Sequence, residues 1–346
     1  MITFKRLLPG EIPWAEMDTF WDRIVFQTRE WMDFIAQTQG AQPVVAEIRD
    51  DGTPVGYFSG LTVRRFGLKI LGSPLRGWTT SYQGFNLVRG FPRHRALAAL
   101  ERFAFHELGC VHLEICDRYL TLEDGAGSQF HCQPYCSYES DLTPAPDEIF
   151  GAMESACRRC IRKAEKSGVR IEEAQDDHFA VEYHDQLCEV FAKHGKRPTY
   201  GLERVRSLIR SVGPSGNLLL LRARNPEGDC IATGIFPGCN QMAEFWGNAS
   251  HKYGLHLRPN ELLHWYAMRY WKDRGVKTYD WGGGGDCKEK YGCKAVSCPV
   301  FIKSRHPVLY RLRETARRAY KLKSVIAYRL RSLASFGSRG HRGALD

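Results

Sequence analysis

The sequence predicts an α+β protein of two domains, each a mostly antiparallel sheet flanked by helices, with a basic helix at the C-terminus. At 346 residues the chain is too long for one ordinary hydrophobic core. A composition of 43% apolar and 25% charged residues is typical of a folded globular protein and excludes disorder as the main state. Alternating apolar runs mixed with runs of helical periodicity indicate that both strands and helices contribute.

The first domain is predicted to span residues 1–145 and to open with a helix and an antiparallel meander. Its predicted elements are a helix at 20–36, strands at 44–48 and 55–63, a helix at 93–108 and a strand at 111–115. The turn Asp50-Asp51-Gly52 between the two alternating runs indicates a hairpin. The proline-broken loop at 141–147 is the predicted boundary between the domains.

The second domain is predicted to span residues 146–306. Its predicted elements are a charged helix at 148–167, a strand at 169–174, helices at 179–195 and 203–212, strands at 217–224, 230–236 and 242–250, a helix at 260–274 and a strand at 276–281. Asn260 is a candidate N-cap for the penultimate element and Gly275 its stop. The last strand leads into four consecutive glycines, 282–285.

Nearly all of the net charge of +10 lies in the predicted tail, residues 307–346, and the two residues before it. From Arg305 to Asp346 there are eleven Lys or Arg residues and two acids. Leu322, Ile326, Leu330 and Leu333 recur at helical spacing among these basic residues. Such a helix suits an anionic surface, either tRNA phosphate or acidic lipid headgroups. The alternative is a terminal helix that packs its apolar stripe on the body.

The N-terminal residues lack the apolar stretch of a signal peptide, and no run reaches the roughly 18 apolar residues of a spanning helix. We therefore expect a cytoplasmic protein, either free or peripheral to the inner face of the membrane. Twelve cysteines in such a chain are expected to be reduced and to act as small buried hydrophobes. Cys157 and Cys160 have metal-like spacing but no second pair, so neither a metal nor a cofactor is expected.

Four segments of the chain carry a resemblance to a known family. They are FQTREW at 26–31, RRCIRKAEKSGV at 158–169, the run from FWG at 245–247 through RPN at 258–260 to LLHW at 262–265, and YDWGG at 279–283 with CKEKYG at 287–292. These segments resemble the Fem family of aminoacyl-tRNA-dependent peptidyltransferases, which are relatives in the GNAT superfamily. The resemblance reaches from residue 26 to about residue 303 and implies two GNAT-like domains. It also implies an N-acyltransferase that forms an amide bond.

Amide formation needs a deprotonated amine, a carbonyl held in line with it, and positive charge or hydrogen-bond donors at the developing oxyanion. By the resemblance, Lys288 lies near the reacting centre and stabilises the transition state. Asp280 and Asp286 flank the glycine turn, where either could orient the acceptor amine or take its proton. In the alternative interpretation, Asp280 ends a strand and caps the turn.

Further residues are candidates for substrate binding. The cations of the second segment suit phosphate groups, and glycines permit close backbone approach to a ligand. The candidates are Arg158, Arg159, Arg162, Lys163, Trp31, Trp246, Arg258, Asn260, Gly283, Gly284 and Tyr291.

The sequence is compatible with more than one donor and more than one acceptor. The resemblance favours aminoacyl-tRNA as donor and a peptide or cell-envelope precursor as acceptor. Residues 251–260 lack the glycine-rich pyrophosphate loop of acyl-CoA enzymes, which lowers but does not remove the second hypothesis, acyl-CoA-dependent N-acylation of an amino sugar or small amine. Phe34, Ile35 and Ala36 occupy the region where nucleotide-binding relatives carry a lysine, which favours acceptors other than a UDP-linked precursor. The third hypothesis is a non-catalytic docking module.

Overall fold

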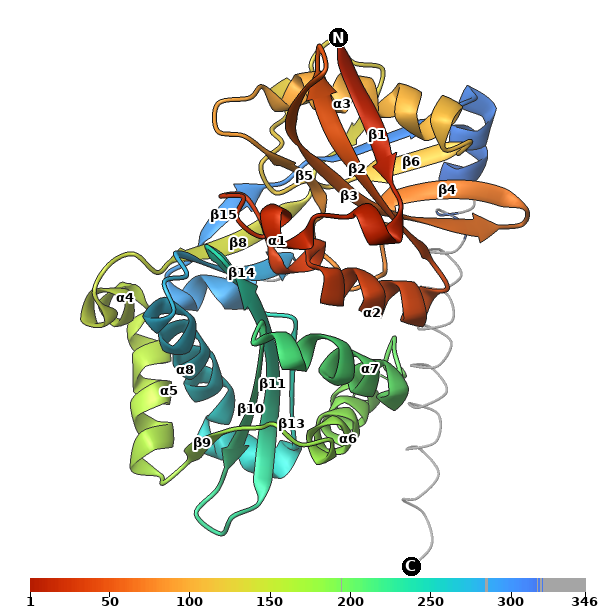
Figure 1. The fold of residues 1–346 in the computed structure, drawn as a ribbon. Helices are drawn as coiled ribbons and strands as arrows, with labels where there is room; N and C mark the ends of the chain where they lie inside the picture. Colours follow the sequence, from red (N-terminus) through yellow and green to blue (C-terminus); the bar gives the residue numbers. More distant parts are fainter. Residues whose placement is uncertain (194, 284–285, 316, 318, 320–346) are drawn as a thin grey trace, which may run out of the picture.

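The computed structural model describes residues 1–193, 195–283, 286–315, 317 and 319. Within them the chain forms two eight-stranded sheets, one in the upper and one in the lower half of Figure 1. The first sheet has the order β1-β2-β3-β4-β6-β16-β7, with β5 paired to β3. Its strands are β1 (Ile2–Leu7), β2 (Gln42–Asp50), β3 (Thr53–Arg65), β4 (Leu68–Ser73), β5 (Gly84–Leu87), β6 (His112–Ile115), β7 (His131–Gln133) and β16 (Val300–Ser304).

The second sheet repeats this order as β9-β10-β11-β12-β14-β8-β15, with β13 paired to β11. Its strands are β8 (Cys136–Asp141), β9 (Arg170–Glu173), β10 (Leu218–Arg224), β11 (Cys230–Cys239), β12 (Met242–Glu244), β13 (Gly247–Ser250), β14 (Thr278–Gly283) and β15 (Lys294–Ser297). In each sheet one neighbouring pair is parallel, β4 with β6 and β12 with β14, and the other pairs are antiparallel. The predicted pair of mostly antiparallel, helix-flanked sheets is therefore confirmed.

The two sheets exchange one strand each. β8 follows β7 in the chain but inserts between β14 and β15 of the second sheet. β16 follows β15 but inserts between β6 and β7 of the first sheet. The domain limits at residues 145 and 306 stay a prediction, and the exchange ties the two halves together by backbone hydrogen bonds.

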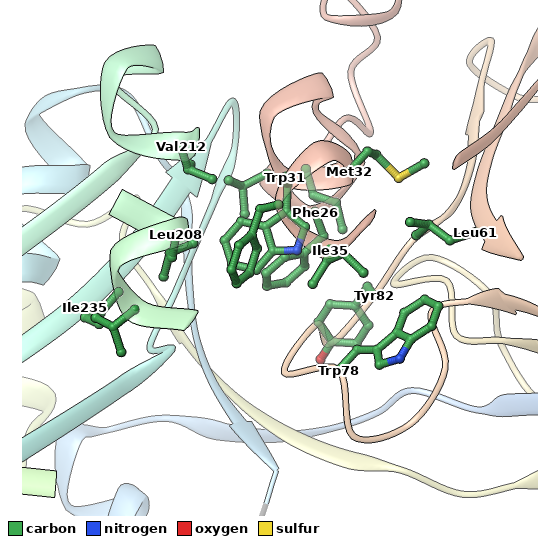
Figure 2. Close-up of a cluster of buried hydrophobic side chains, with 14 of the residues drawn as sticks. Phe26, Trp31, Met32, Ile35, Leu61, Trp78, Tyr82, Leu208, Val212 and Ile235 are labelled. Atoms are coloured by element: carbon green, nitrogen blue, oxygen red, sulfur yellow. The ribbon is translucent and has the colours of Figure 1, made fainter. Parts of the chain in front are cut away.

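Helices cover both faces of each sheet. The main helices are α1 (Trp14–Met17), α2 (Arg29–Gln39), α3 (Arg93–Arg102), α4 (Pro146–Ala152), α5 (Ser155–Lys166), α6 (His178–Ala192), α7 (Leu202–Val212) and α8 (Pro259–Asp273). α3 packs its apolar face on the first sheet, and α8 packs with α5 on the second. α2 contacts α7 across the boundary between the sheets. Figure 2 shows the shared core there, with Trp31 and Phe26 against Leu208 and Val212.

Several predicted elements begin or end elsewhere. The helix predicted at 20–36 begins only at Arg29, because the Thr28 side chain accepts a hydrogen bond from the Trp31 amide and caps it. The helix predicted at 148–167 is two helices, α4 and α5, since Met153 and Glu154 are extended. Asn260 is not the N-cap of α8: Arg258 holds that position in a left-handed conformation.

The strand predicted at 242–250 is divided into β12 and β13. β12 runs parallel to β14, whereas β13 bends back to pair with β11. The bend at Phe245 and Trp246 opens the second sheet where β12 and β14 diverge. This opening positions the candidate site.

Residues 307–315 are helical and begin the predicted tail. Tyr310 stacks on His131, with ring centroids 3.7 Å apart. The apolar stripe predicted at Leu322, Ile326, Leu330 and Leu333 lies outside the described residues.

Candidate active site

A cavity of about 610 Å³ opens where β12 and β14 diverge. The second domain lines it with residues 244–246 and 281–283 and with Lys288. The first domain lines the opposite side with Cys116 and with the loop that follows β4, residues 74–81. The cavity therefore lies between the two halves of the chain, and each half supplies polar groups to it.

Two buried carboxyl groups face each other at the base of this opening. Glu244 ends β12 and is directly opposite Asp280 of β14 in the parallel register. Their relative exposures are 5% and 0%. Asp280 accepts hydrogen bonds from the Tyr82 hydroxyl at 2.8 Å, the Ser137 hydroxyl at 2.6 Å and the Gly282 amide at 2.5 Å.

Among the described residues, the Glu244 carboxyl accepts fewer hydrogen bonds than the Asp280 carboxyl does. Its Oε1 accepts a hydrogen bond from the Ser81 hydroxyl at 2.6 Å, while its Oε2 is buried without a hydrogen-bond partner in the described part of the chain. Burial, and then the charge of Asp280, raise the pKa of Glu244 well above its usual range. Burial also raises the pKa of Asp280, but its three hydrogen bonds oppose that rise. Asp280 is thus the better anion, and Glu244 is the group suited to gain and lose a proton.

Lys288 organises the glycine turn beside these acids. It lies in a 3₁₀ helix, Asp286–Tyr291, and its Nζ donates to the carbonyl oxygens of Trp281, Gly282 and Gly283, the last two at 3.0 Å. Gly282 has φ +66°, a conformation that favours glycine. The three carbonyl contacts hold the ammonium group at the cavity wall, where it acts as a positive point charge.

Gly283 is fixed by close packing. Its amide donates to the Tyr135 hydroxyl at 2.8 Å. A Cβ atom at this position would lie 2.7 Å from the Tyr135 ring, so no larger residue fits without displacing that ring. The two residues together shape the cavity wall opposite the first-domain loop.

The first-domain loop is anchored to the second domain before it reaches the acids. The Trp246 indole donates to the Thr79 carbonyl at 2.8 Å, and Arg204 of α7 donates to the Thr79 hydroxyl at 3.0 Å. Trp31 lies outside the cavity in the core, 0% exposed, and its indole donates to the Thr80 hydroxyl at 3.0 Å. These contacts position the next two residues of the loop so that they hydrogen-bond the two carboxyl groups.

An aromatic cluster supports the cavity wall from behind. Tyr291 stacks on Trp281 with ring centroids 4.2 Å apart, and His264 lies 4.8 Å from the same indole. Burial, together with the charges of Lys290 and Lys288, lowers the pKa of His264 to about 3. His264 is therefore neutral and hydrogen-bonds the Tyr279 hydroxyl at 3.2 Å, which leaves it a packing residue.

Arg76 stands at the mouth of the cavity. Within the described part of the chain no carboxylate pairs with its guanidinium. Burial and the charge of nearby Arg317 lower the pKa of Arg76. An arginine beside the cavity that forms no ion pair with a described residue suits an anionic group of a ligand.

The basic segment of α5 lies away from this cavity. Arg158 donates to the carbonyl oxygens of Gly151 and Met153 and so caps the end of α4. Arg159, Arg162 and Lys163 are exposed on the same helix, with none of them among the cavity residues. Their predicted role in phosphate binding stays a prediction.

The other predicted residues are distributed around the site. Arg258 is exposed and caps α8, and the Asn260 amide donates to the Ser250 hydroxyl at 3.4 Å. Gly284 lies outside the described residues, as does the side chain of Asp286. The structure therefore brings together five of the predicted residues at the cavity or its wall: Trp246, Asp280, Gly283, Lys288 and Tyr291.

Sequence reasoning missed Glu244, Ser81, Tyr82 and Arg76. Glu244 had one local signal, a single acid in an otherwise apolar strand. Ser81 and Tyr82 had none, since they reach partners 163 and 198 residues away.

Comparison with known proteins gives the class. Residues 152–291 match the family described as an acetyltransferase (GNAT) domain. The structure is similar to that of FemX, with a TM-score of 0.74 at 15% identity, covering 89% of this chain and 99% of FemX. No curated protein sequence matches the chain.

Two further solved structures are similar. The C-terminal domain of a putative lysylphosphatidylglycerol synthetase from Agrobacterium fabrum has a TM-score of 0.52 at 12% identity, covering 79% of this chain and 87% of that one. A tandem GNAT protein from the clavulanic acid biosynthesis pathway has a TM-score of 0.50 at 12% identity, covering 89% and 99%.

The chain thus carries a GNAT acyltransferase domain at residues 152–291. Its complete fold is similar to those of FemX and of the tandem GNAT protein, which confirms the fold expected from the sequence.

Proposed function

We propose that the chain is an N-acyltransferase that transfers an aminoacyl group from aminoacyl-tRNA to an amine of a peptide or cell-envelope precursor. The observation that carries the catalytic part of this proposal is a Glu244 carboxyl oxygen, at the opening between β12 and β14, that has no hydrogen-bond partner among the described residues. A base with a raised pKa is matched to removing a proton from an amine near neutral pH.

In the proposed reaction the acceptor amine attacks the acyl carbon and forms the new C–N bond. The amine proton passes to Glu244, the bond from the acyl carbon to the ribose oxygen breaks, and that oxygen takes the proton from Glu244, which returns to its carboxylate form. Asp280 stays ionised and favours the neutral state of Glu244 after proton transfer, because two adjacent buried anions repel. Lys288 stabilises the oxyanion through its charge, since its donors already point at the turn carbonyls.

The start of α8 supports a donor other than acyl-CoA. In acyl-CoA enzymes of this superfamily the pyrophosphate binds at the corresponding helix N-terminus. Here Pro259 removes one amide donor, and Glu261 places a carboxylate, paired with Lys290 at 2.7 Å, in the first turn. Acyl-CoA-dependent acylation of an amino sugar or small amine remains the second candidate.

For the acceptor, the cavity offers an aromatic wall and one cation. Tyr135, Trp246 and Trp281 line it and suit the apolar face of a sugar or peptide, while Arg76 suits a carboxylate or phosphate on the same molecule. We further propose that the protein is cytoplasmic and that its basic tail, residues 307–346, holds it near RNA or the inner membrane surface.

The test is a coupled assay in which purified protein receives a radiolabelled aminoacyl-tRNA pool or acyl-CoA, together with candidate amine acceptors. We expect RNase to abolish transfer and Glu244→Gln to reduce it, with the exposed residue change Glu203→Gln as control. Transfer from acyl-CoA that survives RNase would move the assignment to the second candidate. Equal activity of Glu244→Gln and wild type would remove Glu244 from the proton path.

A further inference from the structure

The turn between β3 and β4 has an unusual residue at its tip. Arg65 pairs with Leu68, so Phe66 and Gly67 form a two-residue turn with φ of +50° and +78°. Such turns favour asparagine followed by glycine, because a bulky residue is disfavoured at positive φ. The Phe66 side chain is nevertheless 103% exposed, and Leu68 is 42% exposed. Neither turn geometry nor packing accounts for an aromatic residue here.

The same hairpin tip is cationic. Arg64 and Arg65 precede the turn and are exposed, and neither forms an ion pair with any residue that the structure describes. Residues 53–73 contain no acid. Figure 1 shows this hairpin projecting from the body beside the label β4. The tip therefore presents an apolar group surrounded by positive charge.

A second basic and apolar element begins nearby, at the same end of the strands of the first sheet. The Arg305 amide donates to the Val111 carbonyl at 2.9 Å, and the Val111 amide donates to the Lys69 carbonyl at 2.9 Å. These bonds place the start of the C-terminal helix two strand spacings, roughly 10 Å, from the base of the hairpin. On this helix Val308 and Leu312 are 64% and 62% exposed, one turn apart.

We propose that this basic-apolar edge docks the protein on an anionic lipid membrane surface. The edge consists of Arg64, Arg65, Phe66, Leu68, Val308 and Leu312. Its apolar side chains would enter the interface between headgroups and acyl chains, while the guanidinium groups bind lipid phosphates. The proposal does not depend on the reaction proposed above.

A lipid surface fits this edge better than a protein partner does. A stable protein interface buries about 800 Å² on each side, whereas a narrow two-residue turn offers little continuous area. A wedge of one or two apolar side chains is sufficient for interfacial insertion when basic residues add electrostatic attraction. In the described part of the chain no helix is long and apolar enough to cross a membrane, so this contact would be peripheral.

The experiment measures co-sedimentation of the full chain with vesicles of pure phosphatidylcholine or of phosphatidylcholine mixed with phosphatidylglycerol. We expect binding to the anionic vesicles only, falling as salt is raised. Phe66→Asn replaces the aromatic group with the residue that the turn prefers. It should weaken vesicle binding about tenfold while leaving the melting temperature equal or higher.

Two controls make the result specific. Tyr253→Asn removes an aromatic residue that is 57% exposed in the second domain and should leave vesicle binding unchanged. Arg64→Gln and Arg65→Gln should each weaken binding about fivefold. Wild-type vesicle binding by Phe66→Asn would overturn the proposal. So would an unchanged vesicle affinity accompanied by loss of salt-sensitive binding to tRNA, which would assign the edge to RNA.

Discussion

The two sheets have the same strand order and differ where their parallel strands diverge. β4 and β6 of the first sheet correspond to β12 and β14 of the second, and β5 and β13 both return to the third strand of their sheets. At the last paired position of β4 and β12, the first sheet pairs Ser73 with Ile115, whereas the second pairs Glu244 with Asp280. The equivalent pair of positions thus carries no titratable group in the first domain and two buried carboxyl groups in the second.

The first domain closes its own opening between these strands. The Gln83 amide donates to the Cys116 carbonyl at 3.0 Å, and the Phe85 amide donates to Asp117 at 2.7 Å. Gly84 approaches Asp117 so closely that an added Cβ atom would lie 2.4 Å from its carboxyl oxygen. These contacts hold the segments that follow β4 and β6 close together.

The loop that follows β4 gives the first domain a role at the candidate site of the second domain. In the second domain the corresponding connection is only residues 245–246, but in the first it spans 74–83 and crosses to the second domain. There its hydroxyl groups hydrogen-bond the carboxyl pair, Ser81 to Glu244 and Tyr82 to Asp280. The comparison indicates two sheets with the same strand order and, within the described residues, a candidate site in the second, whose acids accept hydrogen bonds from the loop of the first domain.

The largest loss of turnover is expected from changing Glu244, because the first domain has no carboxyl group at the equivalent position. Glu244→Gln keeps the shape of the side chain but cannot accept a proton from the acceptor amine. We expect turnover to fall by about 10²–10⁴-fold, measured under saturating substrates. Glu114→Gln is the matched change in the first domain, since Glu114 is equally buried and pairs with Arg313; it should cost stability with little loss of turnover.

The same substitution has a pH signature. The folded protein holds the proton of Glu244 to higher pH than the unfolded chain does, because burial raises the pKa. Wild-type stability should therefore fall, relative to Glu244→Gln, as pH rises above the ordinary glutamate range. Thermal unfolding of both proteins between about pH 5 and pH 8 measures this. A stability difference that does not change with pH would mean that the pKa of Glu244 in the folded protein is not raised above its value in the unfolded chain.

The next largest loss of turnover is expected from changing Lys288. Lys288→Ala removes the charge at the cavity wall and should lower turnover by about 10²-fold. Lys290→Ala is the neighbouring control, because Lys290 pairs with Glu261 and lies outside the cavity residues. Circular dichroism and melting temperature show whether the glycine turn survives. Activity within a few-fold of wild type, in a folded Lys288→Ala protein, would show that Lys288 only supports the turn.

Much of the fold could be predicted because its signals are local. The alternation in residues 44–48 and 55–63 and the helical periodicity of residues 260–274 reflect burial on one face, which neighbouring residues determine. The errors have physical causes too. Thr28 caps α2, so this helix begins later in the chain than the apolar periodicity predicts. The bend at Phe245 divides one apolar run into two strands, of which β12 pairs with β14 and β13 pairs with β11.

The site was less accessible to sequence reasoning because tertiary contacts assemble it. Lys288 and Asp280 lie in one segment around the glycine turn, so a single motif could indicate both. Tyr82 belongs to the other domain and meets Asp280 only after strand exchange brings the sheets together. No periodicity or spacing encodes that contact. Trp31 illustrates the reverse case, because a motif position is occupied by a core residue that acts on the site only through Thr80.

A change in the loop that crosses between the domains is expected to lower turnover by a smaller factor. Tyr82→Phe removes the hydroxyl that donates to Asp280 and helps keep its pKa down. We expect about a tenfold loss of turnover and an upward shift of the pH at which activity appears. Tyr57→Phe, which removes a hydrogen bond to Glu16 within the first domain, is the control. An unchanged pH profile would mean that the loop contributes packing alone.

The smallest expected effects concern anion binding, for which the two domains offer competing positions. Arg76 lies at the cavity mouth on the first-domain loop, and Arg159 and Arg162 are exposed on α5 of the second domain. Arg76→Ala should raise KM several-fold with little change in turnover, because a contact made equally in the ground and transition states affects binding alone. Arg76→Lys should recover part of that loss through charge without the bidentate geometry. The double change Arg159→Ala with Arg162→Ala should also raise KM if the longer donor reaches α5, and steady-state kinetics with donor and acceptor varied separately tell the two positions apart. If Arg76→Ala leaves both KM values unchanged while the α5 variant raises the donor KM, anion recognition belongs to the second domain, and the first domain contributes only the hydroxyl groups of its crossing loop.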